Sequence, residues 1–97
     1  MSIRQTVRKG ALLLDDYRSE WYQIVEPERL DMHSYSFCVL GQIWGSYDYG
    51  MAFFRRKIEP LVETWTYDHG FFVDGPDEIY DFLDYYWTEE IMQRRMS

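Results

Sequence analysis

The chain has a single cysteine, Cys38, and no run of apolar residues longer than a few positions. One cysteine excludes an internal disulfide and agrees with a reducing compartment. Because a bilayer-spanning helix needs about 20 predominantly apolar residues in succession, such short runs predict no membrane span. Charged and polar residues also interrupt the N-terminal segment, where a signal peptide would need an apolar core. We therefore expect a cytoplasmic protein that does not engage a membrane.

The sequence also lacks internal repeats, low-complexity tracts and a Ser/Gly-rich linker. Its 97 residues suit one small globular domain that spans residues 1–97. The composition is 46% hydrophobic and 20% aromatic, which argues against general disorder, since disordered chains are poor in large apolar side chains. A domain of this size must build its core from large side chains, because it buries only about 60–70% of its unfolded surface.

Positive charge is scarce in the C-terminal part of the chain. Residues 58–97 hold two Lys/Arg and ten Asp/Glu, a net charge of −8, whereas residues 1–57 hold eight and seven, a net charge of +1. A strongly acidic surface repels nucleic acid and anionic membranes and attracts basic partners. We therefore expect a protein as partner, and no direct binding to nucleic acid.

Hydrophobic spacing predicts a mainly α fold, a compact small bundle of about four to five helices. Apolar residues recur at intervals of three and four over several segments, as on one face of a helix. The expected helices and helical turns are residues 2–17, a short turn after Ser19 that carries Trp21 and stops at Glu26, and residues 27–30, 37–44, 49–58 and 76–95. Residues 60–73 stay open: their composition suits one short β-hairpin near 62–73, which would make the fold α+β, and equally a short helix that begins at Pro60.

Capping residues set the expected ends of the middle helices. Ser34 or Ser36 suits the N-cap of the helix over 37–44, and Gly45 suits the left-handed position that ends it. Asp48 suits the N-cap of the helix over 49–58. These residues predict two short helices joined by a tight connection.

The last predicted helix has an apolar stripe that consists of Ile79, Phe82, Leu83, Tyr86 and Trp87. Three carboxylates are expected on the side opposite this stripe: Asp77, Asp81 and Asp84. Glu90 falls within the apolar stripe, where an unpaired carboxylate would be costly. We expect Glu90 to pair with a basic residue such as Arg8 or Arg29, or to reach solvent near the helix end.

Several short blocks of the sequence resemble an uncharacterised family of small proteins encoded by actinobacteriophages and some actinobacteria. The blocks that carry the resemblance are Leu30-Asp31-Met32, Cys38-Val39-Leu40-Gly41-Gln42, Gly45-Ser46-Tyr47, the upstream Trp21 and Ile24, Gly70-Phe71, and Trp87-Thr88-Glu89-Glu90-Ile91. The resemblance implies a cytosolic protein of phage type. It implies no particular activity and no site residues.

Catalytic and metal-binding patterns are weak. Cys38 with His33 or His69 would be the only thiol and imidazole pair, but Cys38 stands between Phe37 and Val39 with no neighbouring cation to lower the pKa of its thiol. Asp31, His33 and Cys38 match no standard zinc spacing. We therefore expect a buried cysteine, no metal, no cofactor and no enzymatic activity.

The aromatic residues exceed what so small a core can hold. Some of tyrosines 47, 49, 67, 80 and 85 are expected to face solvent together with Leu12. Tyrosine and tryptophan are enriched at binding hot spots. The sequence thus predicts a non-enzymatic protein-interaction module that binds a host protein or associates with itself as a homo-oligomer.

An alternative function follows from the acidic stretch 74–90, which holds seven carboxylates and no basic residue. Such charges along a helix can imitate nucleic-acid phosphates and block a nucleic-acid-binding host protein. Together, the two hypotheses assign partner binding to Leu12, Tyr47, Tyr49, Asp77, Tyr80, Asp81, Asp84 and Tyr85.

Overall fold

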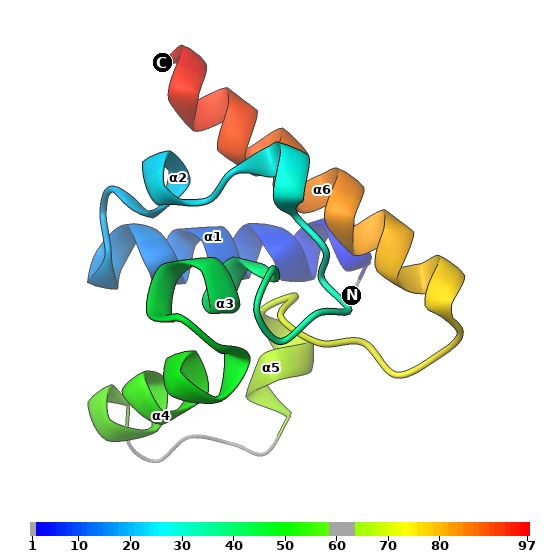
Figure 1. The fold of residues 1–97 in the computed structure, drawn as a ribbon, viewed down its shortest axis with the longest axis horizontal. Helices are drawn as coiled ribbons and strands as arrows, with labels where there is room; N and C mark the ends of the chain where they lie inside the picture. Colours follow the sequence, from blue (N-terminus) through cyan, green and yellow to red (C-terminus); the bar gives the residue numbers. More distant parts are fainter. Residues whose placement is uncertain (1, 59–63) are drawn as a thin grey trace.

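Two long helices that pack against each other, α1 (Ile3–Tyr17) and α6 (Asp77–Met96), form the frame of the fold (Figure 1). The computed structural model describes residues 2–58 and 64–97. The shorter elements are α2 (Trp21–Ile24), η1 (Pro27–Arg29), α3 (Val39–Trp44), α4 (Tyr47–Lys57) and α5 (Trp65–Asp68). Within the described ranges there is no strand, and no helix is long and apolar enough to cross a membrane. The predicted mainly α fold is confirmed, with six α-helices described rather than four to five.

Helix α1 begins with a capping box, in which the Ser2 side chain accepts a hydrogen bond from the Gln5 amide and the Gln5 side chain accepts one from the Ser2 amide. This reciprocal pair satisfies two of the amides that a helix start leaves without partners. Val7 and Leu14 on the predicted apolar face are completely buried. The helix expected over residues 2–17 is therefore confirmed.

Helix α1 contacts the turn at residues 69–70 through Gly10. A Cβ added to Gly10 would lie 2.0 Å from the carbonyl oxygen of His69 and 3.0 Å from the Trp87 ring, so only glycine fits there. Gly70 adopts a left-handed φ of 69°, and its carbonyl accepts a hydrogen bond of 2.8 Å from the Trp87 indole nitrogen. These contacts hold the start of the 71–75 segment between α1 and α6.

The core beside this contact consists of stacked and edge-on aromatic rings. Trp87 lies edge-on to Trp21, with ring centroids 5.6 Å apart, and stacks on Phe71 at 5.4 Å. Phe54 of α4 packs against both Trp65 and Phe71. Offset and edge-on ring pairs add about 0.5–1.5 kcal/mol each beyond their area burial. Aromatic rings therefore join α2, α4, α5 and α6 into one core.

The caps of the two middle helices differ from the prediction. The Ser34 hydroxyl accepts hydrogen bonds from the amides of Ser36 and Phe37, which closes a turn at 34–37, whereas α3 starts later with Cys38 as its N-cap. Gly45 ends α3 with a φ of 95°, as predicted. Helix α4 starts at Tyr47, two residues before the expected start, because the Ser46 hydroxyl accepts from the Tyr49 amide.

The predicted hairpin near 62–73 is wrong for the residues that the structure describes. Trp65–Asp68 forms the short helix α5, and its last turn closes with a hydrogen bond from the His69 amide to the Trp65 carbonyl. In a β-strand, alternate residues such as 65 and 67 lie on the same face. Instead Trp65 is buried and Tyr67 is exposed, as a helical turn requires. Residues 60–63, including the alternative helix start at Pro60, lie outside the described residues.

The buried face of α6 is rotated from the predicted stripe. Its buried residues are Tyr80, Leu83, Trp87, Glu90 and Ile91. Phe82, expected in the core, is exposed, and Tyr80, expected at the surface, is buried. The hydroxyl of Tyr80 donates a 2.8 Å hydrogen bond to the Val73 carbonyl, so the ring can be buried without leaving its polar end unpaired.

Candidate functional site

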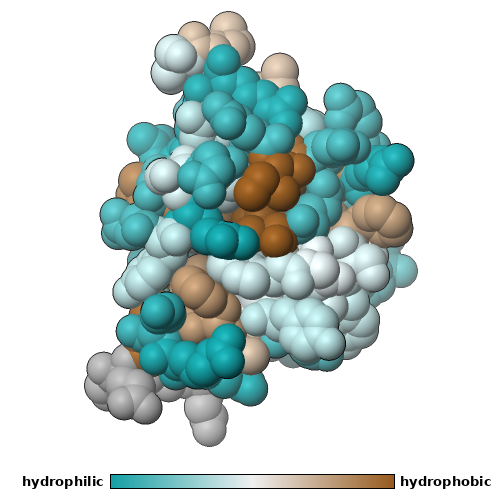
Figure 2. Space-filling view, turned by 60° about the vertical axis from the view of Figure 1, so that its left-hand side comes forward, coloured by the Kyte–Doolittle hydropathy of each residue, from teal (hydrophilic) through white to brown (hydrophobic). Residues whose placement is uncertain are grey.

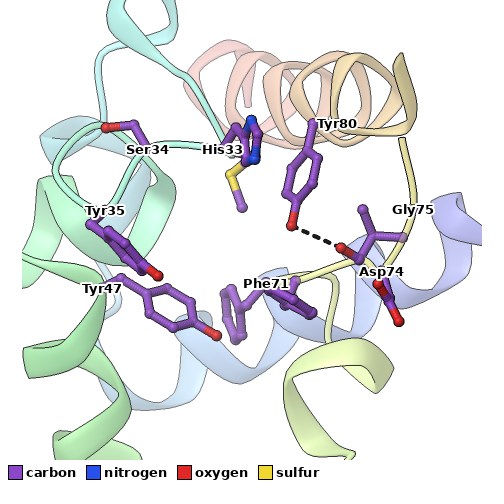
Figure 3. A pocket seen from close by; sticks show the side chains of 11 residues that line it. His33, Ser34, Tyr35, Tyr47, Phe71, Asp74, Gly75 and Tyr80 are labelled. Carbon is purple, nitrogen blue, oxygen red and sulfur yellow. Dashed lines mark hydrogen bonds between the residues drawn. The ribbon is translucent and has the colours of Figure 1, made fainter. Parts of the chain in front are cut away.

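A hollow of about 340 Å³ lies where four segments meet: residues 32–35, the start of α4, residues 71–75 and the start of α6 (Figure 3). We call it the aromatic hollow. Its lining residues are Met32, His33, Ser34, Tyr35, Tyr47, Phe71, Phe72, Val73, Asp74, Gly75 and Tyr80. The volume is at the lower end of the range typical of ligand pockets.

Tyr35 and Tyr47 form one wall of the aromatic hollow, with ring centroids 5.8 Å apart. In Figure 3 both hydroxyls point toward its interior. The Tyr47 amide donates a 2.7 Å hydrogen bond to the Tyr35 carbonyl, and this carbonyl lies so close to Gly41 that a Cβ there would be 2.3 Å away. Tight packing of α3 and α4 therefore fixes the backbone of this wall.

The two rings of this wall differ in exposure. Tyr35 is 70% exposed, whereas Tyr47 is half-buried. Burial raises the pKa of the Tyr47 phenol to about 12, because the charged phenolate loses hydration there. Tyr47 is therefore neutral at physiological pH, and Tyr35 presents more of its ring to solvent than Tyr47 does.

His33 and Tyr80 form the opposite wall. Their rings stack at 4.4 Å with an interplanar angle of 21°. The Nδ1 atom of His33 lies 3.5 Å from a carboxylate oxygen of Asp77, at the start of α6. An acidic group therefore stands directly beside this wall of the aromatic hollow.

Asp84 connects the 32–35 segment to α6 and is not part of a solvent-facing acidic row. Its Oδ1 accepts a 2.7 Å hydrogen bond from the Met32 amide. Burial raises the pKa of its carboxyl, although the bond from Met32 opposes this shift. Asp84 was expected opposite the apolar stripe with Asp77 and Asp81, and this part of the prediction is wrong. The carboxylate positions the loop that carries His33 and Tyr35.

A second hollow, of about 320 Å³, adjoins the first and shares Phe72 and Val73 with it. The Phe72 ring lies edge-on to Tyr67 at 5.1 Å and to Tyr80 at 6.5 Å. Asp68 lines this second hollow. Phe72 is thus an aromatic ridge between two adjacent depressions.

The structure brings two of the predicted partner-binding residues together at the aromatic hollow, Tyr47 and Tyr80. Asp77 lies next to it. Leu12, Tyr49 and Tyr85 are exposed as expected, but they lie on α1, α4 and α6 outside the lining, and so does Asp81. The predicted residues therefore do not form one surface.

Sequence reasoning missed His33, Tyr35, Phe72 and Asp74 as parts of this site. The only local signal was the cluster of turn-forming residues in each segment, Ser34 and Ser36 in one and Asp74-Gly75-Pro76 in the other. Loops on a rigid scaffold often carry binding residues. This tendency makes both segments candidates for a binding site, but it does not predict that they lie side by side in the fold.

Cys38 is 1% exposed and has a structural role. Its sulfur accepts a hydrogen bond of 3.2 Å from the Gly41 amide, and burial raises the pKa of the thiol. Among the described residues there is no group of three or more His, Cys, Asp or Glu residues that could hold a metal ion.

Glu90 is buried and paired. Its Oε1 accepts a 2.7 Å hydrogen bond from Arg94, and Arg8 lies 3.9 Å from its other oxygen. Arg8 was one of the expected partners, whereas the closer partner Arg94 was not foreseen. This ion pair belongs to the core, away from the aromatic hollow.

Comparisons with protein-family models, with curated proteins and with solved structures show no match to this chain. The site is therefore interpreted from its own geometry.

Figure 2 shows the side of the molecule that lies at the left of Figure 1. On this face a compact, strongly hydrophobic area lies between hydrophilic surface above it and a broad area of intermediate hydropathy below it, and smaller, weakly hydrophobic areas lie elsewhere. A small apolar area of this kind is normal on a soluble protein. The aromatic hollow therefore remains the more distinctive surface feature.

Proposed function

We propose that the chain is a non-enzymatic protein-interaction module that binds its partner at the aromatic hollow. The observation that carries this proposal is the convergence of six aromatic side chains on one hollow. They are His33, Tyr35, Tyr47, Phe71, Phe72 and Tyr80. Aromatic residues dominate binding hot spots because they bury large areas and lose few rotamers on binding.

The chemistry of the remaining candidate groups supports binding rather than catalysis. The raised pKa of the buried Cys38 thiol disfavours the thiolate that a nucleophile requires. His33 stacks on an aromatic ring and lies beside Asp77, and within the described part of the chain no hydroxyl or thiol hydrogen-bonds to its ring. The resemblance to phage-encoded proteins makes a protein of the bacterial host our preferred partner, with a second copy of the chain as the competing one.

The acidic-mimic alternative has less support. Asp84 is half-buried and accepts a hydrogen bond from the Met32 amide, so it does not complete a solvent-facing row with the exposed Asp77 and Asp81. We expect the charge reversal Asp81→Lys to weaken partner binding less than about threefold, through the loss of long-range attraction alone. A tenfold loss of affinity in this variant would favour the mimic instead.

Site-specific photo-crosslinking tests the proposed function. A benzoylphenylalanine side chain is placed at Tyr35 and, as a matched control, at Tyr49, which is 68% exposed but outside the hollow. We expect a discrete adduct from position 35 in cells that carry the gene, and its peptides identify the partner by mass spectrometry. An adduct of two copies of the chain would identify self-association.

Reconstitution with the purified partner completes this test. We expect Tyr35→Ala to weaken the complex at least tenfold and Tyr49→Ala to leave it unchanged. Equal adducts from both positions, no adduct from position 35, or equal affinity of the two variants would contradict the proposal.

A further inference from the structure

We infer that the aromatic hollow receives a cationic side chain, a lysine or an arginine, from a basic segment of the partner protein. This inference rests on the proposed function and names the chemistry of the group that enters the site.

The ring faces suit a cation. The negative face of an aromatic ring attracts an ammonium or guanidinium group, and several rings around one space can bind it together. Tyr35 and Tyr47 lie on one side of the hollow and the His33–Tyr80 stack on the other, with Phe71 between them (Figure 3). The long methylene stem of lysine or arginine also packs on apolar surface while its charged end seeks polar groups.

The charges select the same occupant. Asp74 lines the hollow and Asp77 stands beside His33, whereas the lining residues, all within the described part of the chain, include no lysine or arginine. A carboxylate at the rim attracts a cation and repels an anion. Asp74 and Asp77 both belong to residues 58–97, which carry a net charge of −8 and therefore attract a basic partner over a longer range.

The size argues for a side chain rather than a whole helix or strand. A space of about 340 Å³ holds one long side chain with its hydration, whereas a helix needs a groove about 10 Å wide. The adjoining hollow beyond Phe72, lined by Asp68, would take a neighbouring residue of the same segment. The expected ligand is thus a short basic segment that anchors one cationic side chain.

The test is a nuclear magnetic resonance titration of the full chain with small probes. The cationic probes are N-acetyl-arginine amide and N-acetyl-lysine amide; the neutral controls are N-acetyl-citrulline amide, which has the shape of arginine, and N-acetyl-norleucine amide. We expect saturable shifts of backbone amides in residues 32–35 and 71–75 with both cations, at roughly millimolar affinity for so small a ligand. Citrulline should bind at least tenfold more weakly.

Two variants locate the effect, with a matched control. Tyr35→Ala removes an exposed ring and Asp74→Asn removes a charge at an exposed position, so neither change disturbs the core. We expect each to weaken binding of the arginine probe at least threefold, and Tyr49→Ala to leave it unchanged. Near-ultraviolet circular dichroism verifies that all three variants fold.

Several results would overturn the inference. They are equal binding of citrulline and arginine, preference for norleucine, absence of any saturable shift, and shifts confined to residues outside the hollow. If crosslinking at position 35 succeeds while the cationic probes fail, the proposed function stands and this inference fails. If the probes bind while no partner is crosslinked, the cation site stands and the proposed function fails.

Discussion

Arg94, near the end of α6, donates two parallel hydrogen bonds to the carboxylate of Asp15, near the end of α1. The bond from Nε is 3.0 Å long and the bond from Nη2 is 2.8 Å long. The remaining nitrogen, Nη1, donates to Glu90 at 2.7 Å. The Arg94 guanidinium holds the pKa of Asp15 below its ordinary value. One arginine thus neutralises two carboxylates and ties the two long helices together.

Replacement of Arg94 by methionine should destabilise the fold. The variant leaves the buried Glu90 and its neighbour Asp15 without their closest cation, and breaking a largely buried ion pair costs about 2–4 kcal/mol. Urea unfolding of Arg94→Met gives the measurement, with the exposed Arg55→Met as control. We expect the further change Glu90→Gln to restore part of the loss. Equal stability of Arg94→Met and the control would contradict this account.

Gly10→Ala should weaken the contact between α1 and the turn at His69. The new methyl group would lie within 2.0 Å of a backbone oxygen, and overpacking of this kind costs about 1–3 kcal/mol. Thermal unfolding should show a lower midpoint for Gly10→Ala than for Lys9→Ala, which changes an exposed neighbour in the same helix. An unchanged midpoint would show that α1 and the turn can separate freely.

Asp84 offers a test of charge against hydrogen bonding. Asp84→Asn keeps an oxygen that accepts from the Met32 amide and removes a charge that burial disfavours, so stability at pH 7 should be unchanged or higher. Asp84→Ala leaves that amide unsatisfied and should lower stability by about 1–2 kcal/mol. Urea unfolding of both variants provides the comparison. Equal losses in the two variants would show that the negative charge itself is required.

Tyr47 should make the fold sensitive to alkali. The phenol has a pKa of about 12 in the folded chain against an ordinary value of 10.0, so its burial stabilises the fold fully below pH 10. This contribution is lost as the pH rises from about 10 to about 12, because the unfolded chain then releases the proton more readily. Tyr47→Phe should flatten the decline in unfolding free energy between about pH 10 and about pH 12, the range set by that shift. An unchanged decline would place the sensitivity elsewhere.

The long helices were predictable because their signals are local and agree with one another. In α1 the apolar spacing, the Ser2 cap and the Gln5 partner all act within one segment. In α6 the acidic start, the arginines near the end and the preceding proline favour the same helix. Because these local signals agree, both segments form helices close to the expected bounds.

The short elements depended on contacts that no local pattern contains. The composition of residues 64–67 favours a strand, but the packing of Trp65 against Phe54 and Phe71 in the core outweighs this preference. The buried face of α6 differs from the predicted one because Tyr80 donates a hydrogen bond to the Val73 carbonyl and stacks on the His33 ring. Both outcomes follow from tertiary packing, which overrides weak β propensity and an approximate helical wheel.

The candidate site was only partly predictable for the same reason. Tyr80 belongs to a helix with clear signals, whereas Tyr47 was expected in the connection before the helix over 49–58. Tyr35 and Asp74 reach the hollow through irregular segments. The segments meet because Asp84 accepts from Met32 and because Gly41 admits the Tyr35 carbonyl. Pairings between residues this far apart in the chain leave no trace in sequence periodicity.

The backbone at Tyr35 is held by the Tyr47 amide and packed on Gly41, while most of its ring lies in solvent. Association at this position therefore restricts only a few side-chain torsions, and the entropy lost on binding is small. Because the ring contributes little to the core, substitutions at position 35 can alter which partner is preferred without a matching loss of fold stability. Under the proposed function, position 35 can therefore change partner preference at little cost to the stability of the fold.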